Sequence, residues 1–455
     1  MNGMLTLDQL EELVASGEID TVVVAFTDMQ GRLIGKRATG QFFLDSVVKE
    51  WHACDYLLAV DMEMEPVPGF KAASWDKGYG DFVIKPDLAT LRRIPWLDAT
   101  ALCLGDVVDH HGEPLPHSPR AILKKQLARL SQRGMMAKMA SELEFYAFDD
   151  DFRTAREKRY HDVQTSGWYI EDYHIFEGTK REKLLRAIRN GIDAAGIPVQ
   201  ESKGEWGPGQ EELNLVYAEA LEMADRHVVF KNGAKEIAWQ QGKAITFMAK
   251  WKKDLAGSSC HIHASLWDQE ADKPLFADKD DKNGFSKLFQ NYLAGLLAAG
   301  GDATLLLAPN LNSYKRFVAG SFAPTNLVWS RDNRTAGFRV LGSGGASLRV
   351  ECRVPGADVN PYLAYAGLLA AGLHGVEQGL ELPEAFSGDA YQSGDVPAVP
   401  STLREATERF DRSEVMRAAL GDAVVDHYVH AARWEQAEYD RAVTDWELIR
   451  YFERG

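Results

Sequence analysis

Residues 347–354 read SLRVECRV, and this short stretch constrains the fold strongly. Its apolar side chains fall on even positions, whereas Arg349, Glu351 and Arg353 fall on odd ones. Alternation with a period of two is typical of a β-strand that packs one face into a core. Because the stretch contains no turn residue to place it at an exposed edge, its charged face is expected to contact something other than water.

Other stretches alternate in the same way. MASELEFYAF places Glu142 and Glu144 on one strand face, and SSCHIHASLW places His261 and His263 on one face. GQEELNLVY adds Glu212, which follows a Gly/Pro turn. Each stretch alone is also compatible with a solvated strand face or with satisfied surface histidines. That reading weakens when the stretches are considered together.

Together these strands would bring many acidic groups to one face of one sheet. Carboxylates at close range repel one another and burial raises their pKa, so such a cluster requires cations. Oxygen-rich ligand sets suit Mg²⁺ or Mn²⁺ better than structural Zn²⁺, which prefers thiolates. The carboxylates exceed what one ion needs, which predicts two or more ions per site. The candidate ligands are Glu142, Glu144, Glu205, Glu212, His261 and Glu351.

Arginines accompany these acidic residues. Guanidinium groups do not bind metals, but they pair with phosphate and carboxylate oxygens. Acidic ligands, metals and arginines in one site predict phosphoryl transfer between anionic substrates. No GxxxxGK[ST] motif occurs, and the glycine-rich GSGGAS at 342–347 is better explained as a loop. The candidate arginines are Arg316, Arg334, Arg339, Arg349 and Arg353.

The overall charge argues against several classes of partner. The 455 residues include 67 acidic and 51 basic side chains, a net charge of −16, so we expect neither nucleic-acid nor anionic-membrane binding. The four cysteines are scattered without a CxxC pair, which is typical of a cytoplasmic protein. The acidic, amphipathic N-terminus is unlike a signal peptide. The apolar run 361–376 is too short to span a bilayer and predicts a buried helix.

The order of the expected elements predicts an α+β fold. A helix at 6–16 precedes a hairpin that turns at Met29-Gln30-Gly31, and the breaker-rich run 69–96 is expected to be an ordered loop. Beyond Ser118-Pro119, which should start a helix, strands and helices alternate, and several strands follow one another without a crossover helix. We therefore expect a small strand-rich domain over 1–112 and a larger domain with an antiparallel sheet over 113–455.

At the acidic and arginine-containing motifs the chain resembles the glutamine synthetase superfamily. The resemblance covers nearly the full length, and its motifs occur in the family's order. It implies a β-grasp N-terminal domain and a catalytic domain with a curved antiparallel sheet. It also implies homo-oligomeric rings, usually dodecamers, in which a neighbour's N-terminal domain completes each site. The matching motifs are ELEF at 142–145, GE at 204–205, PGQEE at 208–212, GSSCHIH at 257–263, NSYKR at 312–316, RDNRTAGFR at 331–339 and RVECRVPGADVNPYL at 349–363.

The resemblance also implies roles for individual residues. One metal would be held by Glu144, Glu205 and Glu212, and the other by Glu142, His261 and Glu351. Glutamate would be held by Arg316, Arg334, Arg353 and the backbone of Gly257. ATP would contact His263, Ser265, Arg334, Arg339 and Arg349. The implied reaction phosphorylates the glutamate γ-carboxylate with ATP, after which an amine displaces phosphate.

The sequence departs from true glutamine synthetases where ammonium would bind. After NSYKR, Phe322 stands where the family has a flap glutamate, and the aspartate-bearing DGSS-type segment is not recognisable. Replacing an anion by an aromatic ring disfavours a small hydrated cation and suits the carbon chain of an organic amine. Trp206 could add a second apolar wall, or simply pack, and Asp55 or Asp61 could deprotonate the amine.

These departures predict a γ-glutamylamide ligase for an amine such as ethanolamine, a polyamine or an alkylamine. The sequence looks most like the ethanolamine-type branch. The alternatives are an ordinary glutamine synthetase with an altered ammonium site and a non-catalytic ring that regulates other proteins. Tyr391 aligns loosely with a tyrosine that some bacterial relatives adenylylate, although loop packing explains it better. The sequence does not choose between these amines or between Mg²⁺ and Mn²⁺.

Overall fold

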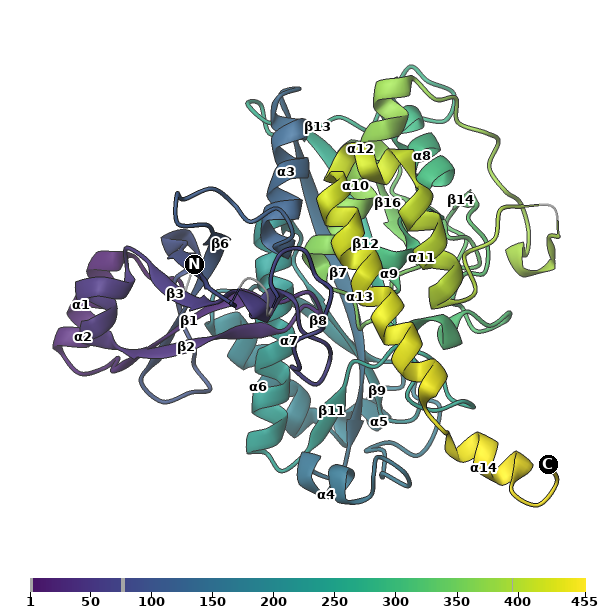
Figure 1. Ribbon diagram of the computed structural model, residues 1–455. Coiled ribbons are helices and arrows are strands. Elements are labelled where there is room, and N and C mark those ends of the chain that lie inside the picture. The colour runs from purple at the N-terminus through teal and green to yellow at the C-terminus, as the bar shows by residue number, and fades with distance from the viewer. Residues whose placement is uncertain (1–2, 75–77, 395) are drawn as a thin grey trace.

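The computed structural model describes residues 3–74, 78–394 and 396–455, which form two sheets and a layer of helices (Figure 1). The smaller sheet has the strand order β2-β1-β6-β4-β3, with β5 paired to β6. Strands β1 and β6 are parallel, and the other pairs are antiparallel. Its strands are β1 (Thr21–Thr27), β2 (Leu33–Thr39), β3 (Trp51–Cys54), β4 (Asp81–Pro86), β5 (Arg92–Arg93) and β6 (Thr100–Val108).

The predicted hairpin is confirmed as the β1–β2 pair. Its turn is closed by the Asp28 carboxylate, which accepts hydrogen bonds from the backbone N–H groups of Gln30 and Arg32, and Gly31 supplies a positive φ of 83°. The expectation that 69–96 is a loop was wrong in part, because β4 and β5 lie within it. The apolar part of β4 is short, and glycine and proline residues flank it, so its strand pattern is not evident in the sequence.

The larger sheet has the order β14-β15-β16-β12-β7-β9-β8, and only the β14–β15 pair among its described strands is parallel. The stretch 347–354 supplies β16, which lies between β15 and β12 and therefore has no free edge. The strands are β7 (Met135–Phe148), β8 (Val199–Gly204), β9 (Gln210–Leu215), β10 (Ala218–Glu219), β11 (Ala244–Thr246), β12 (Cys260–Asp268), β13 (Lys273–Pro274), β14 (Trp329–Arg331), β15 (Phe338–Leu341) and β16 (Arg349–Cys352).

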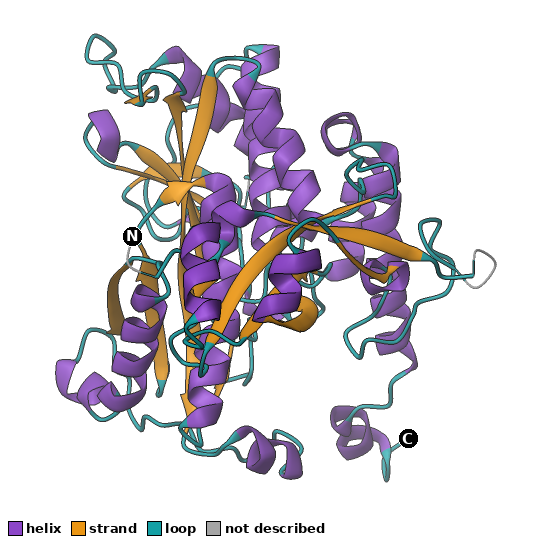
Figure 2. Cartoon of the chain, turned by 90° about the vertical axis from the view of Figure 1, so that its left-hand side faces the viewer, coloured by secondary structure: helices purple, strands orange, loops and turns teal. Residues whose placement is uncertain are grey.

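Helices pack together with this curved sheet around one main core, and Figure 2 shows them running beside its long strands. The expected α+β fold class is thereby confirmed. The helices are α1 (Leu7–Ala15), α2 (Gly40–Phe42), α3 (Pro119–Ser131), α4 (Phe152–Glu157), α5 (Ile175–Thr179), α6 (Glu182–Ala194), α7 (Ala220–Gln240), α8 (Lys287–Ala299), α9 (Thr304–Leu307), α10 (Pro361–Gln378), α11 (Leu403–Arg412), α12 (Glu414–Leu420), α13 (Asp422–Arg441) and α14 (Asp445–Tyr451).

Helix α10 is the buried helix that the apolar run 361–376 predicts. Asn360 caps its start by accepting from the Tyr362 N–H, Pro361 occupies its first turn, and Gly379 ends it in a left-handed conformation. Most of its side chains are buried on all sides, so it stabilises the fold through the hydrophobic effect. No helix in the described part of the chain is long and apolar enough to cross a bilayer.

The N-terminal sheet is tied closely to the rest of the chain. Arg120 of α3 is buried and forms ion pairs with Asp87 and Asp106 of the N-terminal part and with Asp225 of α7, at 2.7, 2.6 and 2.9 Å. Apolar residues of the N-terminal part, including Met29, also belong to the main hydrophobic core. The proposed domain boundary between residues 112 and 113 stays a prediction.

Candidate active site

The register of the large sheet places charged residues of three neighbouring strands in a row. Glu144 of β7 lies opposite Glu212 of β9, which in turn lies opposite Lys203 of β8. Because directly opposed residues point to the same face, these side chains meet. Glu205 follows the end of β8, and one carboxylate oxygen each of Glu144, Glu205 and Glu212 lies within 4.8 Å of the others. The first expected ligand set is therefore brought together.

The electrostatics of this cluster favour a bound cation. Burial, followed by repulsion from Glu205, raises the pKa of Glu144 to about 8. Burial, followed by repulsion from Glu142 and the other two carboxylates, raises the pKa of Glu212 to about 9. A divalent ion would relieve both the burial penalty and the mutual repulsion. The residues present therefore fit the metal that the sequence predicts.

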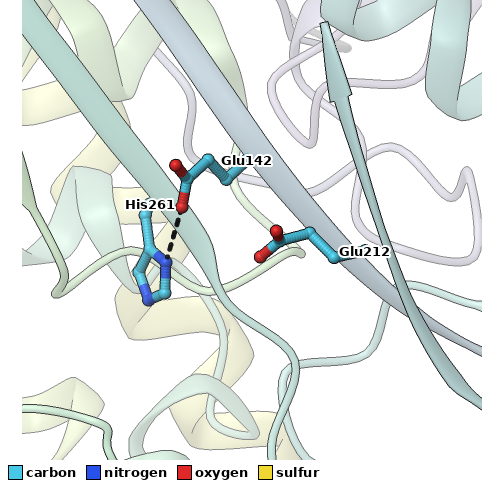
Figure 3. A group of neighbouring side chains, drawn as sticks. All are labelled: Glu142, Glu212 and His261. Atoms are coloured by element: carbon cyan, nitrogen blue, oxygen red, sulfur yellow. Dashed lines mark hydrogen bonds and ion pairs between the residues drawn. The ribbon is translucent and has the colours of Figure 1, made fainter. Parts of the chain in front are cut away.

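A second cluster forms around Glu142 (Figure 3). Glu142 of β7 and His261 of β12 point toward one another, with Glu142 Oε2 3.2 Å from His261 Nδ1, and Glu212 lies beside them. Glu351 Oε1 lies 3.6 Å from the same His261 nitrogen. His261 Nε2 is buried and has no hydrogen-bond partner among the described residues. The second expected set, Glu142, His261 and Glu351, is also brought together.

His263, which was expected to contact ATP, lies in direct contact with this second acidic cluster. Its Nε2 is 2.7 Å from Glu142 Oε1, and Glu142, His263 and Glu351 form another possible ligand set. Burial alone would raise the pKa of Glu142, but its hydrogen bonds with His261 and His263 outweigh burial and lower it. Ser265 lies further along β12, where its hydroxyl accepts a hydrogen bond from Trp267 Nε1 at 2.9 Å.

The arginines divide into buried and accessible groups. Arg353 Nη1 donates to Glu351 Oε1 at 2.6 Å, and Arg339 Nη1 donates to Glu351 Oε2 at 3.1 Å. Burial alone would raise the pKa of Glu351, but His261 and Arg353 outweigh burial and lower it. Arg349 donates to His263 Nδ1 at 3.1 Å, whereas Arg334 is exposed. Glu351 of β16 is therefore the centre of an ionic network with Arg353 and Arg339, and Arg349 on the same strand face contacts His263.

Arg316 is held deep in the molecule beside Gly257. It is 2% exposed and donates to Ser259 Oγ at 3.0 Å, and its Nε has no hydrogen-bond partner in the described residues. A Cβ atom on Gly257 would lie 2.5 Å from Arg316 Cγ, so only glycine fits there. Gly257 and Arg316, which were both expected at the glutamate subsite, are therefore neighbours.

The two aromatic candidates for the amine subsite also meet. The ring centroids of Phe322 and Trp206 are 6.3 Å apart, and both residues are about half exposed, at 52% and 49%. Phe322 has a φ of 59°, which is rare for a bulky residue. Its carbonyl accepts a hydrogen bond from Arg353, the partner of Glu351. The aromatic pair therefore stands beside the acidic clusters.

The N-terminal candidates lie elsewhere. Asp55 begins a short helix over Asp55–Leu58, and Asp61 accepts hydrogen bonds from the backbone N–H groups of Glu63 and Glu65. These bonds explain Asp61 as a turn-forming residue. A catalytic role for either aspartate stays a prediction. The hydroxyl of Tyr391 donates to the Ala323 carbonyl at 3.0 Å, which supports its packing interpretation.

Two polar residues at the site were missed by sequence reasoning. Gln210 donates to Glu144 Oε2 at 3.1 Å and to the Gly257 carbonyl at 3.0 Å, so it links both subsites. Lys203 forms an ion pair with Glu205. Gln210 lies inside the PGQEE motif, and Lys203 lies two residues before the predicted ligand Glu205. Their closeness to predicted ligands in the sequence could have identified both as site residues.

The curved sheet and its clustered acidic side chains define a catalytic domain of the glutamine synthetase type. A family model described as the glutamine synthetase catalytic domain matches residues 116–451. The chain belongs to the glutamine synthetase family.

Several relatives have more specific names. The chain is 50% identical to the gamma-glutamylethanolamide synthetase GlnA4 of Streptomyces coelicolor, over 99% of this chain and 96% of that protein. It is 34% identical to a glutamate–isopropylamine ligase of a Pseudomonas species, over 98% and 97% of the two chains. A solved structure of GmaS without ligand matches with a TM-score of 0.86 at 27% identity, and the match covers 98% of this chain and 100% of that one.

Proposed function

We propose that this protein is a glutamate–amine ligase that uses ATP to join the γ-carboxylate of glutamate to an organic primary amine, giving a γ-glutamylamide, ADP and phosphate. The observation that carries the proposal is the Phe322–Trp206 pair beside the acidic clusters. The relatives named for γ-glutamylethanolamide and isopropylamine support it. An ethanolamine-like or short alkyl amine is the substrate class that we favour.

Two divalent ions, Mg²⁺ or Mn²⁺, fit the acidic residues. Glu144, Glu205 and Glu212 would hold one ion, and the other would be held by Glu142, His261 and Glu351. When bound, the ions would offset the negative charge of the ATP phosphates and of the transferring phosphoryl group. The approach of Glu142 and Glu351 to His261 Nδ1 and the raised carboxyl pKa values of Glu144 and Glu212 support this assignment.

The chain's own residues would position the anionic substrates. Arg316, with its free Nε, and Arg353 suit the carboxylates of glutamate, and we also assign Arg334 and the Gly257 backbone to this subsite. The residues that we assign to ATP are Arg334, Arg339, Arg349, His263 and Ser265. An oxygen of the γ-carboxylate would attack the terminal phosphorus of ATP, and the bond to ADP would break. Arginines around Glu351 would stabilise the charge that develops on the phosphoryl oxygens.

The second step forms the amide. The neutral amine nitrogen would attack the carbonyl carbon of γ-glutamyl phosphate, the carbon–oxygen bond to phosphate would break, and the nitrogen would lose a proton. Phe322 and Trp206 would contact the carbon chain of the amine and keep water from the acyl phosphate. Asp55 or Asp61 of a neighbouring subunit would take the proton, because in the proposed assembly the N-terminal part of one chain completes the site of another.

An amine panel tests the proposal directly. Phosphate release would be measured with glutamate, ATP and Mg²⁺ and with ammonium, ethanolamine, isopropylamine or putrescine as the amine. We expect kcat/KM for at least one organic amine to exceed that for ammonium by about ten-fold or more, the effect of a well-placed apolar contact. A higher kcat/KM for ammonium would support an ordinary glutamine synthetase instead. Folded protein that releases no phosphate with any amine would support a non-catalytic regulator.

Family membership supports a proposal for the assembly, and the cysteines support one for the location. Family members are oligomeric, and we propose a homo-oligomer, specifically a dodecamer of two hexameric rings with active sites between subunits. We also propose a cytoplasmic location, because the four cysteines are free thiols, as is usual in a reducing compartment.

A further inference from the structure

Lys203 is the cation in direct contact with the first acidic cluster. In the described part of the chain, it provides the one ion pair to any of Glu144, Glu205 and Glu212, through the Glu205 carboxylate. It lies opposite Glu212 in the sheet, and its side chain is 20% exposed. The ammonium group therefore faces the same carboxylates that we assign to a divalent ion.

A second set of contacts surrounds the same ammonium group. Lys203 Nζ lies 4.1 Å from the centre of the Tyr173 ring and 3.8 Å from Asp172 Oδ1. The backbone N–H groups of Asp172 and Tyr173 donate to the carbonyls of Glu205 and Gly204, at 3.0 and 3.2 Å. An aromatic face and a carboxylate are thus fixed beside the end of β8, where both attract an ammonium group.

We propose that Lys203 is a positioning residue that acts as a built-in counter-ion for Glu205 and that the divalent ion replaces. This inference rests on the metal assignment in the proposed function. Before the metal binds, the ammonium group offsets repulsion among the three carboxylates and keeps Glu205 within reach of the other two. When the metal binds, Glu205 would bind the metal instead, and the ammonium group would keep the contacts with Asp172 and the face of Tyr173 that it already has.

This arrangement makes Lys203 a competitor of the metal. A positive charge within a few ångströms of a divalent ion weakens its binding, because the two cations repel and share one carboxylate. The contacts with Asp172 and Tyr173 reduce this competition, because they stabilise the displaced ammonium. Removing the charge of Lys203 should therefore increase the affinity for the metal. Removing its partners Asp172 or Tyr173 should decrease that affinity.

The chain offers a matched control in Lys138 of β7. Its Nζ lies 2.6 Å from Asp272 Oδ1 and 3.8 Å from the centre of the Trp267 ring, so it has the same two kinds of partner as Lys203. Its side chain is 15% exposed, and its carboxylate partner belongs to neither acidic cluster. The Lys138→Met substitution should lower stability without changing the metal dependence.

The test is thermal unfolding of the full-length protein with Mg²⁺, and separately with Mn²⁺, without glutamate, ATP or amine. We expect Lys203→Met to lower Tm in chelator and to reduce the half-saturating Mg²⁺ concentration about ten-fold. Lys203→Arg, which keeps the charge, should stay close to wild type. Tyr173→Leu and Asp172→Asn should raise the half-saturating Mg²⁺ concentration. These two variants still test the inference if Lys203→Met does not fold.

The outcomes separate the two proposals. If Mg²⁺ and Mn²⁺ both leave the wild-type Tm unchanged, the metal assignment is wrong and the inference about Lys203 falls with it. If wild type responds but Lys203→Met has the same or a higher half-saturating concentration, only the inference about Lys203 is wrong. An equal change in Lys138→Met would also overturn it, because the effect would then be general charge removal.

Discussion

Phe322 is a bulky residue whose backbone adopts a conformation that its side chain disfavours. Its positive φ of 59° is held by Arg353, which binds its carbonyl, and by Tyr391, which binds the next carbonyl. Strain of this kind amounts to about 1–3 kcal/mol and persists where the surroundings enforce it. The strained position turns the ring toward Trp206, which connects the backbone conformation to the proposed amine subsite.

Substitutions of Phe322 can distinguish the effect of its aromatic ring on activity from the effect of its backbone strain on stability. We expect Phe322→Ala to lower kcat/KM for isopropylamine about ten-fold, because roughly 1–2 kcal/mol of apolar contact is lost. Phe322→Gly should lose the same activity but unfold at a higher temperature than Phe322→Ala, because glycine adopts a positive φ without strain. Steady-state phosphate release and thermal unfolding measure both effects. An unchanged kcat/KM in both variants would remove Phe322 from the amine subsite.

Glu351 should be needed for both structure and activity. Glu351→Gln removes the carboxylate charge that Arg353 and Arg339 share, although Arg339 keeps its ion pair with Asp332. Disrupting such a buried network destabilises a protein by about 3–5 kcal/mol. We expect phosphate release to fall about 1,000-fold, the size seen when one charge-stabilising group is removed from an active site. Phosphate release and denaturant unfolding measure the two effects.

Glu377 provides the matched control for this substitution. It pairs with Arg129 and Arg133, at 3.0 and 2.9 Å, away from the site. Glu377→Gln should therefore keep its activity. Wild-type turnover by Glu351→Gln would contradict the proposed site.

At the scale of elements, the sequence predicted strand faces better than strand contacts. Alternation in 142–145 and 261–263 placed the correct side chains on one face, because a strand fixes which residues share a face. It did not predict that His263 contacts Glu142, because that contact depends on the register between β7 and β12. The pairing of Arg353 with Glu351 depends on the rotamer of a long side chain, which alternation does not specify.

Helix α13 carries a pH-sensitive contact with the N-terminal part of the chain. His427 Nε2 donates to the Leu58 carbonyl at 2.8 Å, and its ring lies 4.6 Å from that of His117. Burial, followed by the neighbouring His117, lowers the pKa of His427 to about 3, and burial lowers the pKa of His117 to about 4. Both histidines are therefore neutral in the folded protein at neutral pH.

These shifts predict acid sensitivity. Folded-state pKa values below the unfolded value of 6.5 stabilise the protein above pH 6.5, and this stabilisation is lost as the pH falls toward 4 and 3. Each group contributes up to about 1.4 kcal/mol per pH unit in that range. His427→Gln should flatten the dependence of the unfolding free energy on pH between 6.5 and 4, measured by denaturant titration. The same slope as wild type would contradict this role.

At the scale of the whole molecule, exposed apolar side chains indicate surfaces that an assembly would cover. The segment 168–176 exposes more than half of each large apolar residue that it contains. Patches of this kind on a chain of net charge −16 are typical of protein interfaces. We expect light scattering after size-exclusion chromatography to give the mass of a dodecamer. Ile175→Asp should reduce that mass if the segment is an interface, and a monomeric wild type would contradict the proposed assembly.

The three ion pairs of Arg120 have a consequence for any such assembly. They join the N-terminal sheet, α3 and α7 through one buried guanidinium group, so the two sheets are expected to move as a single rigid unit. A neighbouring chain that touches the N-terminal sheet would then also set the placement of the acidic strands on the far side of α7. Contact between copies and geometry at the carboxylates would be mechanically linked, with this buried arginine as one of the connections.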